Sequence, residues 1–389
     1  MDSHLTRIRL AAVAALAIPA LAGAASPGSP PAASAPVVTA YVLNGGAVTP
    51  INTATNKALK QIPTGGGSYF MAITPNGKKV YANGSDSSGE PVVIPIRTAT
   101  NKPGTQIMVA RNPSALAVTP DSKTLYISDQ ASGDLIAVST ATNQAVGGVP
   151  TGEAPVSAAI TPNGSSGYVA NFGDATVTPF TVATNTAGTA ITMSSDPIGV
   201  AITPDSRTAY VVGVANDGVT RTVTAIRTAT NKALKPIGVG TGPSSIGPPD
   251  IAITPNSKTA YVTSNQGVTP INVATNKPGK LIKVPGEAIA ITPNGKTAYV
   301  VAGSGTVTPI CTATNKPGKP IHVGTSANAI AITPHGKTAY ITSSLGVTPI
   351  NVATNKPGKL IKIPGGAGPI VIGITPAGTT PMSSAPPAP

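Results

Sequence analysis

The chain has no tryptophan, three phenylalanines and a single cysteine, and each of these scarcities narrows its class. Because Cys311 is alone, no disulfide can form within the chain. Aromatic residues make up only 3% of the sequence, which leaves few side chains that could stack on bases or sugars. Forty-two glycines and 41 prolines exclude long helices, because both residues interrupt them.

Motifs of catalysis are also missing. Of the three histidines, His4 lies in the N-terminal targeting segment, and neither His322 nor His335 has a second likely ligand nearby in the sequence, which argues against a zinc or copper site. No Gly-x-Ser-x-Gly elbow occurs, and no glycine-rich phosphate loop follows a strand and opens a helix. These absences weigh against an enzyme but leave that alternative open, and we assign no catalytic residue.

What the chain does have is a repeated unit. Residues 267–283 recur letter for letter at 346–362. The phrase Ala-Thr-Asn occurs eight times, at intervals of 39 to 46 residues, and a Thr-Pro phrase after a short apolar run also occurs eight times. Such a period is typical of the blades of a β-propeller. The asparagines that end the first phrase are Asn56, Asn101, Asn143, Asn185, Asn231, Asn276, Asn315 and Asn355.

One repeat, residues 250–284, divides into four short apolar segments separated by turn residues. The segments are rich in β-branched residues, which favours strands. Proline, glycine and asparagine between them suit tight turns, so we expect a four-stranded antiparallel sheet. The expected strands are 250–253, 260–264, 268–273 and 281–284.

The unit IAITPNSKTAYVTSNQGVTPINVATNKPGKLIKV resembles the repeat of YVTN-type β-propellers, which are related to WD40-like folds. The resemblance extends from about Tyr41 to Pro376. It implies an all-β propeller with four-stranded antiparallel blades. It also implies an exported repeat protein that binds ligands at one mouth of its central channel.

The two ends of the repeat region predict the number of blades. The first repeat begins at a second strand, near Tyr41, and the last ends at a first strand, before Pro376. The two fragments complete an eighth blade, which closes the ring and removes its open edges. We therefore predict eight blades, with seven blades and an unpaired segment as the alternative.

The N-terminus has the pattern of a secretory signal peptide. Arg7 and Arg9 precede an apolar stretch that is too short to span a membrane comfortably, and Ala22-Gly23-Ala24 suits cleavage. We expect a Sec-type signal peptide at 1–24, a disordered Pro/Ala/Ser-rich leader at 25–37, one propeller domain at 38–376 and a disordered tail at 377–389. The mature protein would be secreted or associated with the cell wall, monomeric and without a transmembrane segment.

Eight of the nine tyrosines occupy one position in the second strand of each repeat. A ring of aromatic side chains could form a stacking platform, but packing between blades is the simpler interpretation. Cys311 stands where other repeats have asparagine, and we expect its thiol to be at least half-buried and inert.

Charge divides between the two ends of the predicted blades. Turns that join first to second and third to fourth strands share one end of an antiparallel sheet, and they carry 18 basic residues but only two acids, Asp121 and Asp205. The loops of the opposite end carry ten acids and two arginines. Behind the net charge of +13, we therefore expect a molecule with one basic end and one acidic end.

A broad basic surface attracts polyanions. We expect it to bind an anionic surface polymer or a protein, whereas the lack of interleaved aromatics argues against sequence-specific binding of nucleic acid. Alternatively, lysines in exposed turns only keep the protein soluble. The residues that represent this predicted polyanion-binding surface are Lys57, Lys102, Lys232, Lys277, Lys280, Lys316, Lys319, Lys356 and Lys359.

Four acids, Glu153, Asp196, Asp250 and Glu287, each stand shortly before a first strand in successive repeats. First strands are the innermost strands of a propeller, so these carboxylates could converge at the channel mouth. Hard oxygen ligands suit Ca²⁺, which makes calcium a possible cofactor. The alternative is four solvated loop acids, which are ordinary in turns.

Three functions remain compatible with the sequence. The first is an exported, non-enzymatic scaffold that binds a partner at the cell surface or outside the cell. The second is a metal-dependent hydrolase of the lactonase type, acting at the channel mouth. The third is a structural protein of the cell wall or matrix. The first fits best, because the clustered basic residues are the one repeated feature that the fold itself does not explain.

Overall fold

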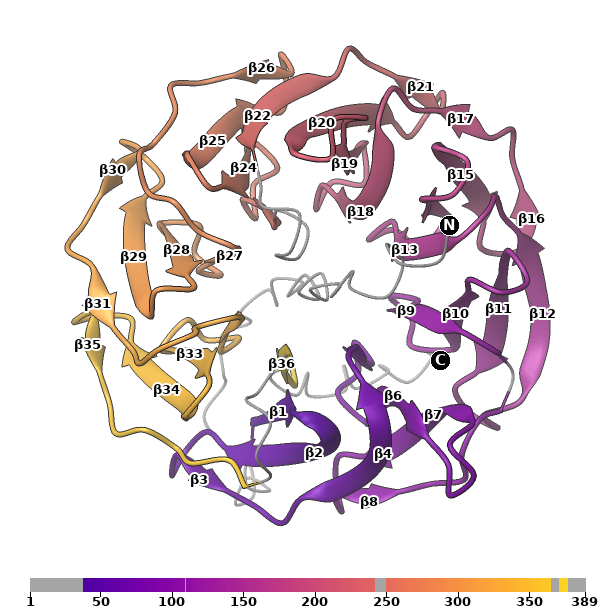
Figure 1. Ribbon diagram of the computed structural model, residues 1–389, viewed down its shortest axis with the longest axis horizontal. Helices are drawn as coiled ribbons and strands as arrows, with labels where there is room; N and C mark the ends of the chain where they lie inside the picture. The colour runs from indigo at the N-terminus through magenta and orange to yellow at the C-terminus, as the bar shows by residue number, and fades with distance from the viewer. Residues whose placement is uncertain (1–37, 109, 242–249, 365–370, 377–389) are drawn as a thin grey trace, which may run out of the picture.

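The computed structural model describes residues 38–108, 110–241, 250–364 and 371–376. In these residues the regular structure consists of β-strands, which form a ring of eight antiparallel sheets around a central axis (Figure 1). The eight-bladed all-β prediction is confirmed. The segments 1–24, 25–37 and 377–389, interpreted as signal peptide, leader and tail, lie outside the described residues. No helix in the described part of the chain is long and apolar enough to cross a membrane.

Each blade begins with a strand near the axis and moves outward (Figure 1). The first strands are β36 (Val371–Ile374), β5 (Met71–Ile73), β9 (Pro113–Val118), β13 (Pro155–Ile160), β18 (Asp196–Ile202), β23 (Ile251–Ile253), β27 (Ala288–Ile291) and β32 (Ile330–Ile332). The second strands are β1 (Thr39–Leu43), β6 (Lys79–Ser85), β10 (Thr124–Asp129), β14 (Ser166–Asn171), β19 (Thr208–Val214), β24 (Thr259–Ser264), β28 (Thr297–Ala302) and β33 (Thr338–Ser343).

The outer strands complete the blades. The third strands are β2 (Gly45–Asn52), β7 (Pro91–Arg97), β11 (Asp134–Ser139), β15 (Thr176–Thr181), β20 (Thr220–Arg227), β25 (Gly267–Asn272), β29 (Thr306–Cys311) and β34 (Gly346–Asn351). The fourth strands are β3 (Lys57–Ala58), β8 (Lys102–Pro103), β12 (Ala145–Pro150), β16 (Thr186–Ala187), β21 (Lys232–Ala233), β26 (Lys277–Pro278), β30 (Lys316–Pro317) and β35 (Lys356–Pro357). Four blades add a further strand beside the third, namely β4 (Ile62–Ser68), β17 (Ile191–Thr192), β22 (Ile237–Thr241) and β31 (Ile321–His322).

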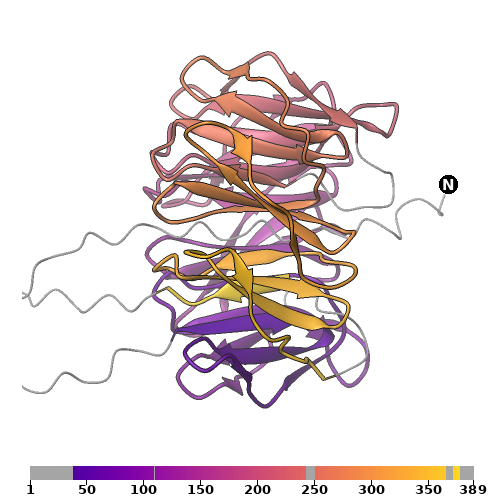
Figure 2. The same ribbon diagram turned by 90° about the vertical axis from the view of Figure 1, so that its left-hand side faces the viewer.

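We number the blades in chain order. Blade 1 contains β36 and β1–β4, blade 2 β5–β8, blade 3 β9–β12, blade 4 β13–β17, blade 5 β18–β22, blade 6 β23–β26, blade 7 β27–β31 and blade 8 β32–β35. In the edge-on view of Figure 2, strands run across the thickness of the ring. The turns that join them therefore lie at its two flat ends.

The last described strand closes the ring. β36 pairs with β1 in antiparallel register, with Ala40 opposite Ile374 and Leu43 opposite Val371. The backbone N–H of Thr39 also donates to the Thr375 hydroxyl, at 3.0 Å. Blade 1 is thus built from both ends of the repeat region, as the sequence predicts, and β36 pairs with the inner edge of β1, which would otherwise be open.

The fourth strand was predicted wrongly in the repeat 250–284. β26 lies at Lys277–Pro278, inside the predicted turn, and residue Ile282 makes only an isolated bridge with Val268. The amide of Gly279 donates to the Pro270 carbonyl at 2.7 Å, which continues the ladder briefly. Because Pro270 has no N–H, it cannot donate back to the Gly279 carbonyl, and the ladder does not continue as a regular strand.

The repeated tyrosines pack between blades, which confirms the simpler interpretation. All eight are fully buried. In seven of them the hydroxyl donates to the side-chain oxygen of an Ala-Thr-Asn asparagine in the next blade around the ring, and we call this contact the Tyr–Asn bond. The pairs are Tyr41–Asn101 (2.6 Å), Tyr81–Asn143 (3.1 Å), Tyr126–Asn185 (2.6 Å), Tyr168–Asn231 (2.6 Å), Tyr261–Asn315 (2.7 Å), Tyr299–Asn355 (2.5 Å) and Tyr340–Asn56 (2.5 Å).

Backbone conformation explains why asparagine is used. All eight asparagines of this phrase have φ between 51° and 58°. This left-handed region is disfavoured for most residues but tolerated by asparagine. Glycine would also tolerate it, but glycine could not accept the tyrosine hydrogen bond. The asparagine of the Ala-Thr-Asn motif therefore both allows the turn and makes a contact with the neighbouring blade.

The interface between blades 5 and 6 is the exception. The hydroxyl of Tyr210 and the side-chain oxygen of Asn276 are both buried, and neither has a hydrogen-bond partner among the described residues. The hydrophobic contacts of this interface are nevertheless made, because Tyr210, Val212 and Val223 share one core cluster with Val262 and Ile271.

This exception gives a test of the Tyr–Asn bond. Tyr299→Phe removes a hydroxyl that has a partner, and we expect it to lower the free energy of unfolding by about 1 kcal/mol. Tyr210→Phe is the matched control. It removes a hydroxyl without a partner and should be neutral or slightly stabilising. Urea unfolding of both variants checks the difference, and an equal loss at Tyr210 would contradict it.

Candidate functional site: the two charged ends of the ring

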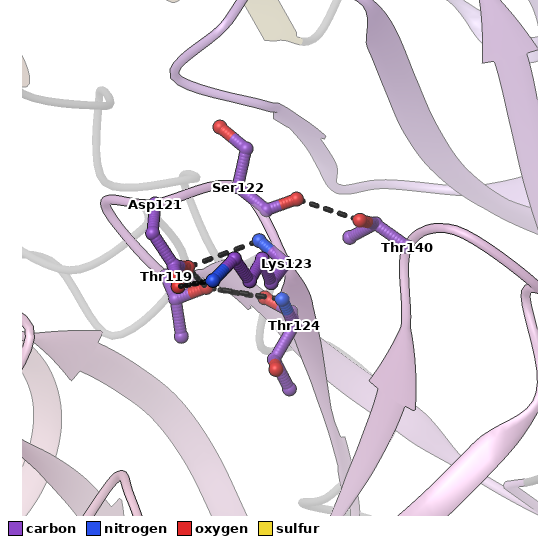
Figure 3. A network of polar contacts seen from close by, with 6 residues as sticks. All are labelled: Thr119, Asp121, Ser122, Lys123, Thr124 and Thr140. Atoms are coloured by element: carbon purple, nitrogen blue, oxygen red, sulfur yellow. Dashed lines mark hydrogen bonds and ion pairs between the residues drawn. The ribbon is translucent and has the colours of Figure 1, made fainter. Parts of the chain in front are cut away.

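The turn between first and second strands is held by its own side chains. In blade 3 the Thr119 hydroxyl donates to Asp121 Oδ1 at 2.6 Å, and the same oxygen accepts the Lys123 amide at 3.0 Å (Figure 3). The Thr124 amide donates back to the Thr119 hydroxyl at 3.0 Å. An Asx turn of this kind fixes the backbone locally. The basic side chain that follows is therefore presented in a defined place.

The turns of each blade are joined at one end of the ring. Thr140, which follows the third strand of blade 3, donates to the carbonyl of Ser122 in the first turn, at 2.6 Å (Figure 3). The bond from Thr98 to Gly77 does the same in blade 2, at 2.6 Å. These contacts confirm that first–second and third–fourth turns share an end, which we call the basic end.

Neighbouring blades are also joined at the basic end. The amide of Asn76 in blade 2 donates to the Ser122 hydroxyl in blade 3, at 2.9 Å. The same contact links Asn163 to Ser206, at 3.0 Å. Together with the Tyr–Asn bonds, these contacts make the basic end a fixed surface rather than a set of independent loops.

The nine lysines predicted to form a polyanion-binding surface are all exposed. Six of them open a fourth strand, directly after the asparagine of a Tyr–Asn bond or its counterpart in blade 6. The structure adds Arg97 and Arg227, each the last residue of a third strand, to the same end. Sequence reasoning missed them because it counted only turn residues.

Lys79 serves the interface between blades rather than the surface. Its ammonium donates to the Thr140 carbonyl and to Asn143 Oδ1. Burial, together with the nearby Arg97 guanidinium, lowers the pKa of Lys79 below its ordinary value. We therefore do not count Lys79 with the exposed cations.

Asp250 and Glu287 belong to adjacent blades at the opposite, acidic end of the ring. The acids of this end are Asp86, Glu90, Asp129, Asp134, Glu153, Asp174, Asp196, Asp217, Asp250 and Glu287. The Asp250 carboxylate accepts the Ile251 amide at 2.9 Å and, across the blade boundary, the Ile289 amide at 3.1 Å. Burial raises the pKa of Asp250 to about 7. Burial also raises the pKa of Glu287, two residues before Ile289.

Glu153 and Asp196 lie in other surroundings. Glu153 is exposed, and its amide donates to Asp174 Oδ2 at 3.1 Å. Asp196 opens β18, where burial raises its pKa. Among the described residues, no hydrogen bond joins either of them to Asp250 or Glu287, and no group of three or more His, Cys, Asp or Glu is placed to hold a metal ion.

Cys311 is exposed, so the expectation of a buried or half-buried thiol was wrong. Hydrogen bonding from Thr314 lowers the pKa of its thiol. Cys311 ends β29, and the asparagines at the same place, Asn272 and Asn351, are exposed as well. The asparagines that occupy this position in other repeats already indicated an exposed side chain at residue 311.

The pKa of Asp250 predicts a pH dependence. An aspartate in an unfolded chain has a pKa of about 3.9. Between about pH 4 and pH 7 the folded state therefore holds the proton more tightly, and the free energy of unfolding falls as the pH rises. Asp250→Asn cannot bind this proton, so its stability lacks this fall with pH. The melting temperature of the variant relative to that of the wild type should therefore increase from pH 4 to pH 8.

Glu153→Gln is the control for this experiment, because the side chain of Glu153 is exposed. Its melting profile should run parallel to that of the wild type. A parallel profile for Asp250→Asn as well would refute the raised pKa of the Asp250 carboxyl.

Solved structures with similar folds include three distant ones. Kuenenia stuttgartiensis hydrazine synthase matches with a TM-score of 0.56 and 21% identity, over 76% of this chain and 96% of that one. Dihydro-heme d1 dehydrogenase NirN matches with a TM-score of 0.71 and 15% identity, over 89% and 77%. A protein of unknown function from Desulfotomaculum acetoxidans matches with a TM-score of 0.55 and 17% identity, over 72% and 94%. At these identities the likeness concerns the fold alone.

A search of curated proteins finds no match. The family model described as lactonase, 7-bladed β-propeller, matches residues 92–345, which is more than half of the chain. The described ring has one blade more than this description states, and the match begins in β7 of blade 2 and ends after β33 of blade 8. The chain therefore belongs to the lactonase family of β-propellers.

Proposed function

We propose that this protein is an exported, non-enzymatic scaffold that binds an anionic polymer through its basic end, at the cell surface or outside the cell. The observation that carries the proposal is the separation of charge between the two ends of the ring. Exposed lysines and arginines gather on turns that hydrogen bonds hold in place, while acids gather at the other end.

The energetics favour a multiply charged partner. A single exposed lysine contributes little, because water and salt screen it over roughly 8 to 10 Å. Many fixed lysines acting together add their contributions and release many counterions from a polyanion. The fixed turns also reduce the conformational entropy that binding would remove from the backbone.

Export is part of the proposal and rests on residues 1–24, with their basic start, apolar stretch and small-residue cleavage site. The mature protein would be a monomer whose repeats are of the YVTN type. An anionic polymer of the cell wall or of the extracellular space would be accessible to such a protein.

The mature protein should bind polyphosphate in a salt-dependent manner. We expect the logarithm of the association constant to fall linearly with the logarithm of the salt concentration, with a slope of about −0.7 for each contacted phosphate if the polymer behaves like a single-stranded nucleic acid. Fluorescence titration at several salt concentrations measures the slope. Absence of binding at low salt would refute the proposal.

A second candidate, a hydrolase of the lactonase type, is favoured by two observations. One is the family match, and the other is Asp250, whose pKa near neutrality suits a proton-transferring group. Hydrolysis of simple lactones, lost in Asp250→Asn and retained in Glu153→Gln, would establish this activity. A preparation that hydrolyses no lactone and whose melting temperature is unchanged by Ca²⁺ or a chelator would leave the scaffold as the function.

A further inference from the structure

The cations of the basic end are not spread evenly around the ring. Blades 6, 7 and 8 each carry one lysine in the first turn and a Lys-x-x-Lys pair after the third strand. These lysines are Lys258, Lys277 and Lys280 in blade 6, Lys296, Lys316 and Lys319 in blade 7, and Lys337, Lys356 and Lys359 in blade 8. All nine are exposed.

Blades on both sides extend this series. Blade 5 adds Arg207, Arg227, Lys232 and Lys235, against one acid, Asp205. Because β36 pairs with β1, blade 1 is a complete sheet and continues the series after blade 8. It carries Lys57 and Lys60, and blade 2 carries Lys78, Arg97 and Lys102. We call this arc over blades 5, 6, 7, 8, 1 and 2 the basic crescent.

Blades 3 and 4 interrupt the ring of charge. In blade 3, Lys123 Nζ lies 3.8 Å from Asp121 Oδ2 (Figure 3), so the charge of this turn is balanced. The place that other blades give to a lysine after Ala-Thr-Asn is taken by Gln144 in blade 3 and by Thr186 in blade 4. The corresponding first turn of blade 4 has Ser165 in place of a lysine.

The lysine pairs of the crescent are held alike. Lys277, Lys316 and Lys356 each open a fourth strand. After each of them a glycine amide donates to a proline carbonyl in the third strand, and the three distances are all 2.7 Å. The pairs therefore recur in one geometry from blade to blade. A chain of evenly spaced anions could meet them in succession.

We infer that the basic crescent is a track for a linear, phosphate-bearing polymer that follows the arc and leaves blades 3 and 4 free. The lysine pairs carry ammonium groups, which bind phosphate as point charges, rather than planar guanidinium groups, which bind an anion through two directed hydrogen bonds. Tyr69 is the one aromatic among the exposed large apolar side chains of the described residues, and it stands in a loop of the acidic end. Recognition would therefore be of charge and spacing, without base stacking.

This inference rests on the proposed function and adds the place and class of the partner. Its test compares two variants of the mature protein that change the net charge equally. The crescent variant is Lys277→Gln, Lys280→Gln, Lys316→Gln and Lys319→Gln. The control is Gln144→Glu, Ser165→Glu, Thr184→Glu and Thr186→Glu, which places the same change on exposed residues of blades 3 and 4.

We expect the crescent variant to bind polyphosphate at least about tenfold more weakly at low salt. The magnitude of its salt slope should fall by roughly 3, which corresponds to four lost phosphate contacts. The control should keep the wild-type affinity within about twofold, because its added charges are screened from the arc. Wild-type affinity should also rise with polyphosphate length until the chain spans the crescent. Circular dichroism checks that both variants remain folded.

Three other results would each overturn a different part of the proposal. Equal losses in the two variants would mean that net charge alone acts, and would overturn the crescent while leaving the scaffold function intact. Stronger binding to vesicles with anionic lipids than to polyphosphate, at equal phosphate concentration, would make a membrane surface the partner and overturn the linear polymer. Failure of the wild type to bind polyphosphate at all would reject the proposed function itself.

Discussion

The structure depends on the contact between a buried tyrosine of one blade and an asparagine of the next. A four-stranded sheet of this size cannot bury both faces alone, so the blades are stable only when packed on one another. Apolar packing draws the blades together but has little direction. The Tyr–Asn bond supplies direction, because its donor lies at the centre of one sheet and its acceptor in a strained turn of another. Seven such bonds run around the ring, across the place where the chain closes it.

The same turn determines what the surface presents. In six blades the residue after the asparagine is a lysine, which opens the fourth strand and is exposed. In five of these six blades a tyrosine hydroxyl holds the asparagine side chain, which defines the backbone position of the lysine that follows; blade 6, with Asn276, is the exception. Where a blade keeps the asparagine but replaces the lysine, as at Gln144 and Thr186, the Tyr–Asn bond is kept and the charge is lost. Architecture and surface charge can therefore vary independently at adjacent positions.

Repetition made the fold predictable. Eight copies of two phrases predict the number of blades, and the incomplete copies at Tyr41 and before Pro376 predict the closure of blade 1. The fourth strand was placed too late, because an apolar run such as 281–284 resembles a strand more than Lys277–Pro278 does. Which groups meet across blades was not predictable either. The bond from Tyr299 to Asn355 joins residues 56 positions apart, and only the packing of the blades brings them together.

The candidate site was predictable to a smaller extent. The basic end follows from topology and residue type, so its lysines were found, while Arg97 and Arg227 needed the observed ends of two strands. The acids of the opposite end depend on burial, which sequence does not show. Asp250 reaches across to Ile289 and is half-buried, whereas Glu153 remains exposed. Acids that precede a first strand in different repeats therefore differ in their exposure to water.

The letter-for-letter identity of 267–283 and 346–362 has a consequence for the order in which the ring assembles. β25 pairs with β24 in the same register as β34 with β33, with Pro270 opposite Tyr261 and Pro349 opposite Tyr340. Either segment would therefore form the same backbone bonds on the other's partner strand. During synthesis, only the short connections to β24 and β33 distinguish the correct partner from the copy two blades away, so fidelity in this protein depends on local folding of each hairpin before distant blades meet.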